Sequence, residues 1–382
     1  MSTAFSTAKA APNGLVDLSE AARVVVHEHA AAPAASLAAA LRQADGQFRF
    51  GAGSAGTLFG EPGANPTSIE TPFDLASVTK PIIALVMARL ERAKRIDRRM
   101  ALKDVLPELA KTASADVPLD LFAAHRAGLE AHGPLYAPLT RGERVDASAA
   151  LLTAANARRA ECVGAAPREG FAPVYSDLGY LLLGAAITRI AGELDEVVAQ
   201  EIATPLGISI GSARQKRLRD ASFDEAVAPT EIVPFRGGVV RGVVHDENAF
   251  AISGHGTSGH AGLFGSALDI MRLGVAVLKT LAGEQQDWLR QEDLAPLVRP
   301  RPQGTLLAGF DSRSGDEPSS GARLGPRTFG HLGFTGTSLW IDPEAGFVGV
   351  LLSNRVHPLR TSLAIRRARP HAYDCMFDAM TR

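Results

Sequence analysis

The chain has 382 residues, of which 46% are hydrophobic and 21% are charged, a composition typical of globular proteins. Its 40 basic and 41 acidic side chains give a formal net charge of −1, so no overall field favours nucleic acid as a partner. No apolar run approaches the length of a transmembrane span and no signal peptide is visible, so we expect a cytoplasmic protein.

The first third of the chain predicts a helix, then strands, then a buried helix. The alanine-rich segment 18–41 predicts the helix, and the glycine-punctuated segment 46–59 predicts strands joined by tight turns. Residues 77–95 are apolar on nearly every side, which predicts a helix that passes through a core. Pro81 is compatible with this helix because it falls near the first turn, where a missing N–H costs little.

The middle of the chain, from about residue 99 to 265, looks helical and rich in loops. Apolar helices are clearest at 179–190 and 194–202. The last third changes character and predicts strands followed by a final helix. These strands are expected at 306–310, 329–341 and 347–352, and the helix at 361–380.

The predicted strands gather near the two ends of the chain, which favours an antiparallel sheet over a βαβ arrangement. We therefore predict a discontinuous α/β domain made from residues 1–98 and 268–382. A mainly helical domain, residues 99–267, would be inserted between its two halves.

Ser77 and Lys80 are the first candidate functional residues. Residues three apart share one face of a helix, so the Lys80 amine can lie beside the Ser77 hydroxyl. A serine hydroxyl is a poor nucleophile until a neighbouring base takes its proton. On these two residues alone, a helix-capping serine and a lysine that reaches for solvent explain the pattern equally well. The same spacing recurs at Ser6 and Lys9, where no apolar periodicity follows and a frayed terminus is expected.

Two further clusters favour the catalytic interpretation. Tyr175 and Asp177 stand immediately before the apolar helix 179–190, and His331 and Gly333 stand on the predicted strand 329–341. Serine acyl transfer needs a nucleophile, a base and an oxyanion hole. A helix start, a loop and a strand edge can supply these three parts. Taken singly, Tyr175 could equally be a packing residue and Asp177 a helix cap.

The three motifs together resemble the serine β-lactamase and penicillin-binding-protein-like superfamily, in its class C-like branch of esterases and D-amino-acid peptidases. That superfamily carries S-x-x-K, then Tyr-x-Asn or Tyr-Ser-Asn/Asp, then Lys-or-His-x-Gly. Further segments look like those of the family and lie in the expected order, at 121–129, 242–249, 259–264, 331–343 and 352–358. The resemblance covers roughly residues 45 to 370.

The resemblance implies an α+β fold of the β-lactamase/transpeptidase type. In that fold a mostly antiparallel sheet is flanked by helices on both faces, and an all-helical domain is inserted. It also implies a small-molecule substrate, with no cofactor and no metal. Ser77 would be the nucleophile, Lys80 its amine partner, and Tyr175 a general base acting with Lys80. The backbone N–H groups of Ser77 and Phe334 would form the oxyanion hole.

The substrate-binding positions implied by the resemblance are Asp177, His331 and Gly333, and two of them depart from the family pattern. Most relatives that act on β-lactams have lysine and threonine or serine where this chain has His331 and Leu332. A neutral imidazole is a poor clamp for a substrate carboxylate, which favours uncharged esters. Asp177 replaces an asparagine, and its charge would favour protonated Lys80 and shift the base role toward Tyr175. Gly333 would let the substrate lie close to the strand.

Several other motifs are expected to be non-catalytic. Ser209 lies in a G-x-S-x-G sequence, but the strand and helix that a nucleophile elbow needs are not predicted around it. His125 is expected to join a turn. The histidines and acids at 245, 246, 247, 255 and 260 match no metal-binding signature, so a structural or pocket-lining role is expected.

Three functional hypotheses follow. The first is a serine hydrolase that cleaves small esters or amides through an acyl-enzyme on Ser77. The second, within the same fold, is a β-lactamase or D-amino-acid carboxypeptidase. The third is a sensor or pseudoenzyme that binds an acyl group without turnover.

Overall fold

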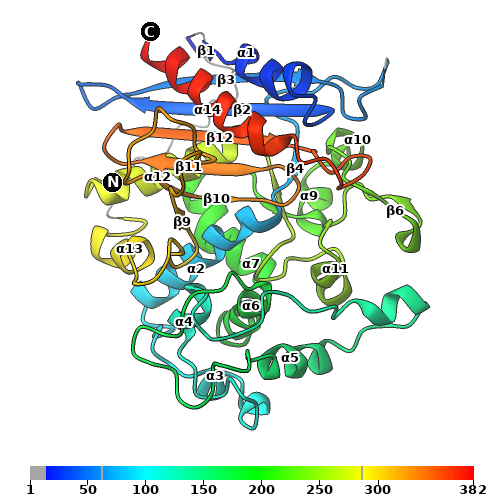
Figure 1. Ribbon diagram of the computed structural model, residues 1–382, viewed down its shortest axis with the longest axis vertical. Coiled ribbons are helices and arrows are strands. Elements are labelled where there is room, and N and C mark those ends of the chain that lie inside the picture. The colour runs from blue at the N-terminus through cyan, green and yellow to red at the C-terminus, as the bar shows by residue number, and fades with distance from the viewer. Residues whose placement is uncertain (1–13, 62, 285–286) are drawn as a thin grey trace.

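The computed structural model describes residues 14–61, 63–284 and 287–382, and a seven-stranded sheet forms its upper part (Figure 1). The strand order is β1-β3-β2-β12-β11-β10-β9. Only the β1–β3 pair is parallel, so the sheet is almost wholly antiparallel. The strands span β1 Val16–Asp17, β2 Ala34–Arg42, β3 Phe48–Gly56, β9 Asp311–Ser312, β10 Phe329–Leu332, β11 Ser338–Asp342 and β12 Phe347–Ser353.

Helices cover both faces of this sheet. On one face lie α1 (Ser19–Arg23) and α14 (Ile365–Thr381), and on the other lies α12 (Ala267–Leu281) (Figure 1). Strand β2 shows the alternation that this arrangement requires, because Leu37 packs in the cluster beneath α14 while Ala38 packs in the cluster around α12. The α+β fold with an antiparallel sheet between helices is therefore confirmed.

The remaining helices lie largely below the sheet (Figure 1). They are α2 Thr79–Arg92, α3 Leu102–Val105, α4 Leu119–Ala123, α5 Ala147–Asn156, α6 Asp177–Ala191, α7 Leu194–Val198, α8 Thr204–Leu206, α9 Ala213–Arg219, α10 Phe223–Ala226, α11 Glu247–Ser253 and α13 Gln291–Val298. Within the described part of the chain, no helix is long and apolar enough to cross a membrane.

Residues 99–267 also hold short strands, so this segment is not wholly helical, contrary to the all-helical insertion that the family resemblance implies. They are β5 Gly211–Ser212, β6 Ile232–Val233, β7 Gly238–Val239 and β8 Leu263–Gly265. Strand β8 pairs with β5 and with β4 (Phe73–Asp74), the strand just before Ser77. One hydrophobic cluster runs from the sheet face through these helices, so the two parts share a continuous core.

The predicted helix at 18–41 is wrong over its second half. Residues 19–28 are helical, but 34–42 form β2, which pairs with β3 on one side and β12 on the other. Alanine favours helix only weakly, and tertiary pairing overrides that preference. The small side chains also suit a strand that is covered by helices on both faces, where a larger side chain would hold those helices away.

Three further strand predictions need correction. Segment 46–59 is mostly the single strand β3 rather than several strands joined by turns. Segment 306–310 is not a strand, although Leu306 makes an isolated bridge to Asp311. Segment 329–341 is a hairpin, β10 and β11, whose turn contains the Gly333 position. The predicted helices at 77–95, 179–190, 194–202 and 361–380 are confirmed to within a few residues.

Candidate active site

Ser77 lies in a 3-10 turn, residues Ala76–Val78, that joins β4 to α2. Ala76 has a left-handed backbone with φ of 47°, an uncommon conformation for a residue with a side chain. Its N–H donates to Asp74 Oδ1 at 2.8 Å, and Asp74 Oδ2 accepts from the His245 N–H at 2.6 Å. The buried Asp74 carboxylate therefore holds the turn that presents Ser77 to a cavity of about 770 Å³.

Lys80 lies one turn further along and is fully buried. Its Nζ donates to Ser77 Oγ at 2.8 Å, to Asp177 Oδ1 at 2.7 Å and to the His260 carbonyl oxygen at 3.3 Å. Burial opposes the charge on this amine, but Asp177 and Tyr175 outweigh burial, so the pKa of Lys80 is raised. Lys80 is accordingly an ammonium group aimed at the serine hydroxyl.

Tyr175 and Asp177 approach Lys80 from the start of α6. Lys80 Nζ lies 4.8 Å from the centre of the Tyr175 ring. Burial raises the pKa of the Tyr175 phenol, although the Lys80 charge works in the opposite direction. For Asp177, burial is outweighed by Lys80, His132 and His260, which hold the pKa of this carboxyl well below its usual range.

The capping role expected for Asp177 belongs to its neighbour. Ser176 is the cap of α6, because its Oγ accepts the Gly179 N–H at 3.3 Å. The Ser176 N–H in turn donates to His125 Nδ1 at 3.0 Å, and the His125 ring lies 4.7 Å from the Tyr175 ring. His125 thus joins a turn, as expected, and the turn that it joins carries Tyr175.

The β10–β11 hairpin forms the opposite side of the cavity. Burial, followed by the charge on Lys80, lowers the pKa of His331 to about 3, so this imidazole is neutral. A Cβ on Gly333 would lie 1.9 Å from Thr337 Oγ1 and 2.7 Å from the Leu75 carbonyl oxygen. The packing of the hairpin against the segment before Ser77 therefore requires glycine at this position, independently of any substrate.

Two backbone N–H groups in the cavity wall are available to bind a ligand. Among the described residues, neither the Ser77 N–H nor the Phe334 N–H donates to any acceptor. Both residues line the cavity. Free backbone donors at two converging segments are what an oxyanion hole requires.

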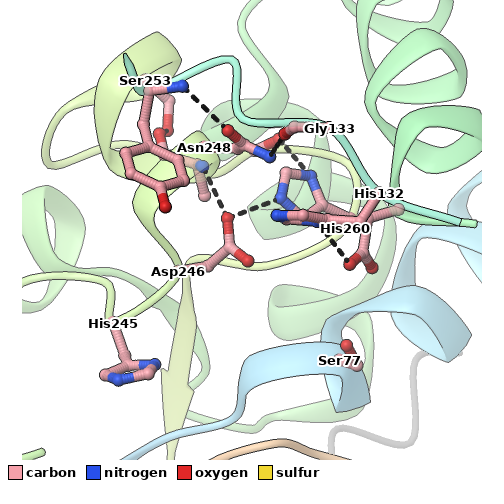
Figure 2. A network of polar contacts seen from close by, with 12 residues as sticks. Ser77, His132, Gly133, His245, Asp246, Asn248, Ser253 and His260 are labelled. Carbon is pink, nitrogen blue, oxygen red and sulfur yellow. Dashed lines mark hydrogen bonds and ion pairs between the residues drawn. The ribbon is translucent and has the colours of Figure 1, made fainter. Parts of the chain in front are cut away.

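Above Ser77 lies a polar network that the sequence did not reveal (Figure 2). Asp246 Oδ1 is 2.8 Å from His260 Nε2, and Asn248 Nδ2 donates to the Gly133 carbonyl oxygen at 2.8 Å. His132, the residue before Gly133, approaches the Asp177 carboxylate at 3.5 Å. This network fixes the loop at 132–133 and the His260 carbonyl beside the Lys80 ammonium.

The structure also settles where the other histidines and acids lie. His245, Asp246 and Glu247 line the cavity, whereas His255 does not. His245 is within 3.0 Å of Glu231 Oε2, and Arg360 forms ion pairs with both Glu231 and Glu247. The positive charge of Arg360 is therefore paired with carboxylates at the cavity edge.

Arginines line a second part of the cavity, although the basic cluster at 366–369 predicts a solvated face of the C-terminal helix rather than a binding patch. Within the described part of the chain, Arg355, Arg366 and Arg369 have no carboxylate within ion-pairing distance. Arg355 Nε donates to the Phe334 carbonyl oxygen at 2.7 Å, and its guanidinium lies 4.5 Å from the Phe334 ring. Arg366 and Arg369 lie three residues apart on α14, and the fold adds Arg355 from the segment after β12.

The two other serine motifs lie elsewhere. Ser209 lines a separate cavity, and no strand precedes it in the way that a nucleophile elbow requires. Ser6 and Lys9 lie outside the described residues.

Comparison with known proteins identifies the family. A family model described as Beta-lactamase matches residues 23–373. A "Putative D-alanyl-D-alanine carboxypeptidase" of Escherichia coli O157:H7 is 32% identical over 199 residues, which cover 48% of this chain and 45% of that protein. An "N-acetylmuramyl-L-alanine amidase" of Bacillus subtilis strain 168 is 32% identical over 197 residues, covering 48% and 44% respectively. The match thus spans less than half the length of these curated relatives.

Solved structures extend the likeness over nearly the whole chain. EstCE1, described as a hydrolase with promiscuous acyltransferase activity, superposes with a TM-score of 0.66 at 20% identity and covers 93% of this chain and 97% of its own. A penicillin-binding protein homologue from Caulobacter crescentus gives 0.63 at 21% identity, covering 95% and 99%. At such identities these structures show the fold alone. Together with the family model, they establish that the chain belongs to the β-lactamase family.

Proposed function

We propose that the protein is a serine hydrolase that cleaves small esters or amides through a covalent acyl-enzyme on Ser77. The observation that carries the proposal is the 2.8 Å contact between Lys80 Nζ and Ser77 Oγ at a cavity that also exposes two unengaged backbone N–H groups. Membership in the β-lactamase family supports the same chemistry.

In acylation, Ser77 Oγ would attack the substrate carbonyl while its proton passes to the Tyr175–Lys80 pair. The carbonyl oxygen would gain negative charge and accept hydrogen bonds from the Ser77 and Phe334 N–H groups. The leaving group would then take the proton from the pair as its bond to carbon breaks. In deacylation, water would repeat these steps and release the acid.

The pKa directions indicate which form of the pair is active. Both pKa values are raised, so the resting pair holds a charged Lys80 and a neutral Tyr175. A base forms only when this pair loses a proton, and the two groups then share the remaining one. Because Asp177 stabilises the ammonium, the phenolate form of Tyr175 is favoured as the base.

The proposal is tested by assaying wild type and Ser77→Ala on p-nitrophenyl esters, a chromogenic cephalosporin and a D-alanyl-D-alanine peptide. We expect wild type to hydrolyse the esters, Ser77→Ala to lose that activity, and mass spectrometry to find the acyl group on Ser77. Ester turnover that survives Ser77→Ala would contradict the mechanism. A stoichiometric burst without turnover would instead support the acyl-binding sensor.

A second candidate substrate class is favoured by the arginines. The neutral His331 does make a poor carboxylate clamp, but Arg355 and Arg366 place positive charge in the same cavity. We therefore propose substrates with a carboxylate, such as those of a D-amino-acid carboxypeptidase, as the alternative to uncharged esters. If it is correct, Arg366→Met lowers the ratio of kcat/KM for the peptide to kcat/KM for a neutral ester. An unchanged ratio would leave the uncharged esters as the substrate class.

A further inference from the structure

Arg369, on α14, donates hydrogen bonds to the backbone of the β10–β11 turn. Its Nη2 donates to the Gly333 carbonyl oxygen at 3.2 Å and to the Thr337 carbonyl oxygen at 3.3 Å. The Gly333 N–H also donates to the Thr337 carbonyl oxygen at 2.7 Å and closes the turn. One guanidinium group therefore joins the two ends of the turn that carries Phe334.

The Gly333 carbonyl matters because it shares a peptide unit with the Phe334 N–H. A donor that binds the oxygen of an amide draws electron density away from its nitrogen and makes the N–H a stronger donor. A cationic donor has a larger effect than a neutral one. The charge on Arg369 is thus placed at the carbonyl oxygen of the peptide whose N–H would face the oxyanion.

Arg369 is a buried cation that forms no ion pair with the described carboxylates. The residue is 7% exposed, its Nε has no hydrogen-bond partner, and no carboxylate of the described residues lies within ion-pairing distance. Burial lowers its pKa to about 10. A buried cation without a counter-ion destabilises a fold unless a charge arrives to compensate it. A negative oxygen developing near the Phe334 N–H is such a charge.

Arg355 secures the next peptide but in a different way. It donates to the Phe334 carbonyl oxygen, which belongs to the peptide between Phe334 and Thr335. The contact can therefore orient the Phe334 backbone but cannot polarise its N–H. This difference separates the two arginines.

We propose that Arg369 is a positioning residue that orients and polarises the Gly333–Phe334 peptide, so that the Phe334 N–H binds the oxyanion more strongly than a peptide without that contact would. The proposal rests on the proposed function, because it presumes an oxyanion at this site. It assigns to a C-terminal helix a part in transition-state stabilisation that acts through the Gly333–Phe334 peptide, in addition to the place of Arg369 in the cavity wall.

The test compares Arg369→Met and Arg369→Lys with Arg367→Met as the matched control, since Arg367 is exposed on the same helix and does not line the cavity. On a neutral p-nitrophenyl ester, Arg369→Met should lower kcat by about 10- to 100-fold with KM nearly unchanged, which is less than the loss of a whole oxyanion donor. Arg369→Lys keeps the charge and should recover part of kcat. Arg367→Met should match wild type.

A boronic acid gives a second readout that a purely structural role would not move. Ser77 Oγ adds to the boron, its proton passes to the Tyr175–Lys80 pair, and the boron becomes a tetrahedral anion with an oxygen in the oxyanion position. Its affinity should fall by the same factor as kcat in Arg369→Met, whereas the affinity for the product acid should not. Circular dichroism identifies any variant that fails to fold, and Arg369→Lys then carries the test.

Two results would overturn the inference. One is an Arg369→Met enzyme that is less stable but keeps wild-type kcat and boronic acid affinity. The other is an equal loss of affinity for product acid and boronic acid. Both leave the proposed function intact, because that function is tested separately by the turnover of wild type and by the loss of activity in Ser77→Ala.

Discussion

The described part of the molecule contains two serine–lysine pairs within hydrogen-bonding distance, and one of them lies in the candidate active site. Lys80 Nζ is 2.8 Å from Ser77 Oγ, and Lys216 Nζ is 3.1 Å from Ser209 Oγ. Each serine lines a cavity, and the cavity beside Ser209 is the larger, at about 1090 Å³. Neither the distance between the two side chains nor the available volume distinguishes a nucleophile from an ordinary serine here.

The two pairs differ in the partners of the serine N–H, in the other contacts of the lysine and in the direction of the lysine pKa shift. The Ser209 N–H is already engaged by Asp269 Oδ1 at 2.9 Å, whereas the Ser77 N–H is free among the described residues. Lys216 also donates to the Ser209 carbonyl oxygen at 2.8 Å, which ties it to the backbone. Burial lowers the pKa of Lys216, so by its amine alone it would be the better base. What marks the Ser77 site is the Tyr175 phenol beside the lysine and backbone N–H groups that have no acceptor among the described residues, rather than a basic lysine.

The strongest test of this contrast replaces the two serines in turn. Ser77→Ala should reduce ester hydrolysis by roughly 10⁴-fold or more, in the range seen when a nucleophile is removed. Ser209→Ala, the matched control, should keep wild-type kcat and KM. Equal losses in both variants would break the distinction between the two pairs.

The lysines give the next largest effect. Lys80→Met should lower kcat by about 10²- to 10⁴-fold, because the pair that carries the serine proton is lost. Lys216→Met removes a hydrogen bond to the Ser209 carbonyl and should cost about 1 kcal/mol of stability, with activity unchanged. Steady-state kinetics and chemical denaturation measure the two effects separately. A Lys216→Met enzyme with reduced kcat would show that the second pair also contributes to turnover.

The pH dependence sharpens the comparison further. Since the pKa values of Lys80 and Tyr175 are both raised, kcat/KM should climb as pH rises into the alkaline range. Asp177→Asn removes the anion that stabilises the ammonium, so the pKa of Lys80 falls and the climb moves to lower pH. Asp269→Asn, the corresponding change beside Lys216, should leave the profile in place. A profile that does not move in Asp177→Asn would contradict the role assigned to this carboxylate.

The smallest effect is expected at the outer partner of Asp177. The His132 side chain is 48% exposed and 3.5 Å from the carboxylate, a geometry in which an ion pair contributes about 0.5 kcal/mol or less. His132→Ala should therefore change kcat by less than about threefold and leave the thermal unfolding midpoint nearly constant. A loss as large as that of Lys80→Met would instead place His132 in the proton pathway.

The sequence predicted the parts of the site that lie on periodic elements. Ser77 and Lys80 open a helix whose apolar pattern is unmistakable, and Tyr175 precedes another. The expectation of a solvated helix face at 366–369 was wrong for Arg369, because a charged residue gives no sign in the sequence that the fold will bury it. The Asp246–His260 pair is similar, since it arises between two loops with no periodicity of their own.

The main error in the fold has a related cause. Five of the nine residues of strand β2 are alanine, so its local preference points to helix while its pairing with β3 and β12 decides the outcome. Strand β12 lies some 300 residues away in the sequence. A prediction from a local window cannot include that partner.

The pairing of β2 with β12 also sets when a new chain can become reactive. Synthesis runs from the N-terminus, and contacts between distant segments form late. The turn bearing Ser77 leaves the ribosome early, but the hairpin with Phe334 follows about 250 residues later and the helix with Arg369 about 290 residues later. A nascent or prematurely terminated chain therefore carries Ser77 without the Phe334 N–H. Under the proposed function, reactivity toward acyl groups would be delayed until nearly the whole sheet has been made.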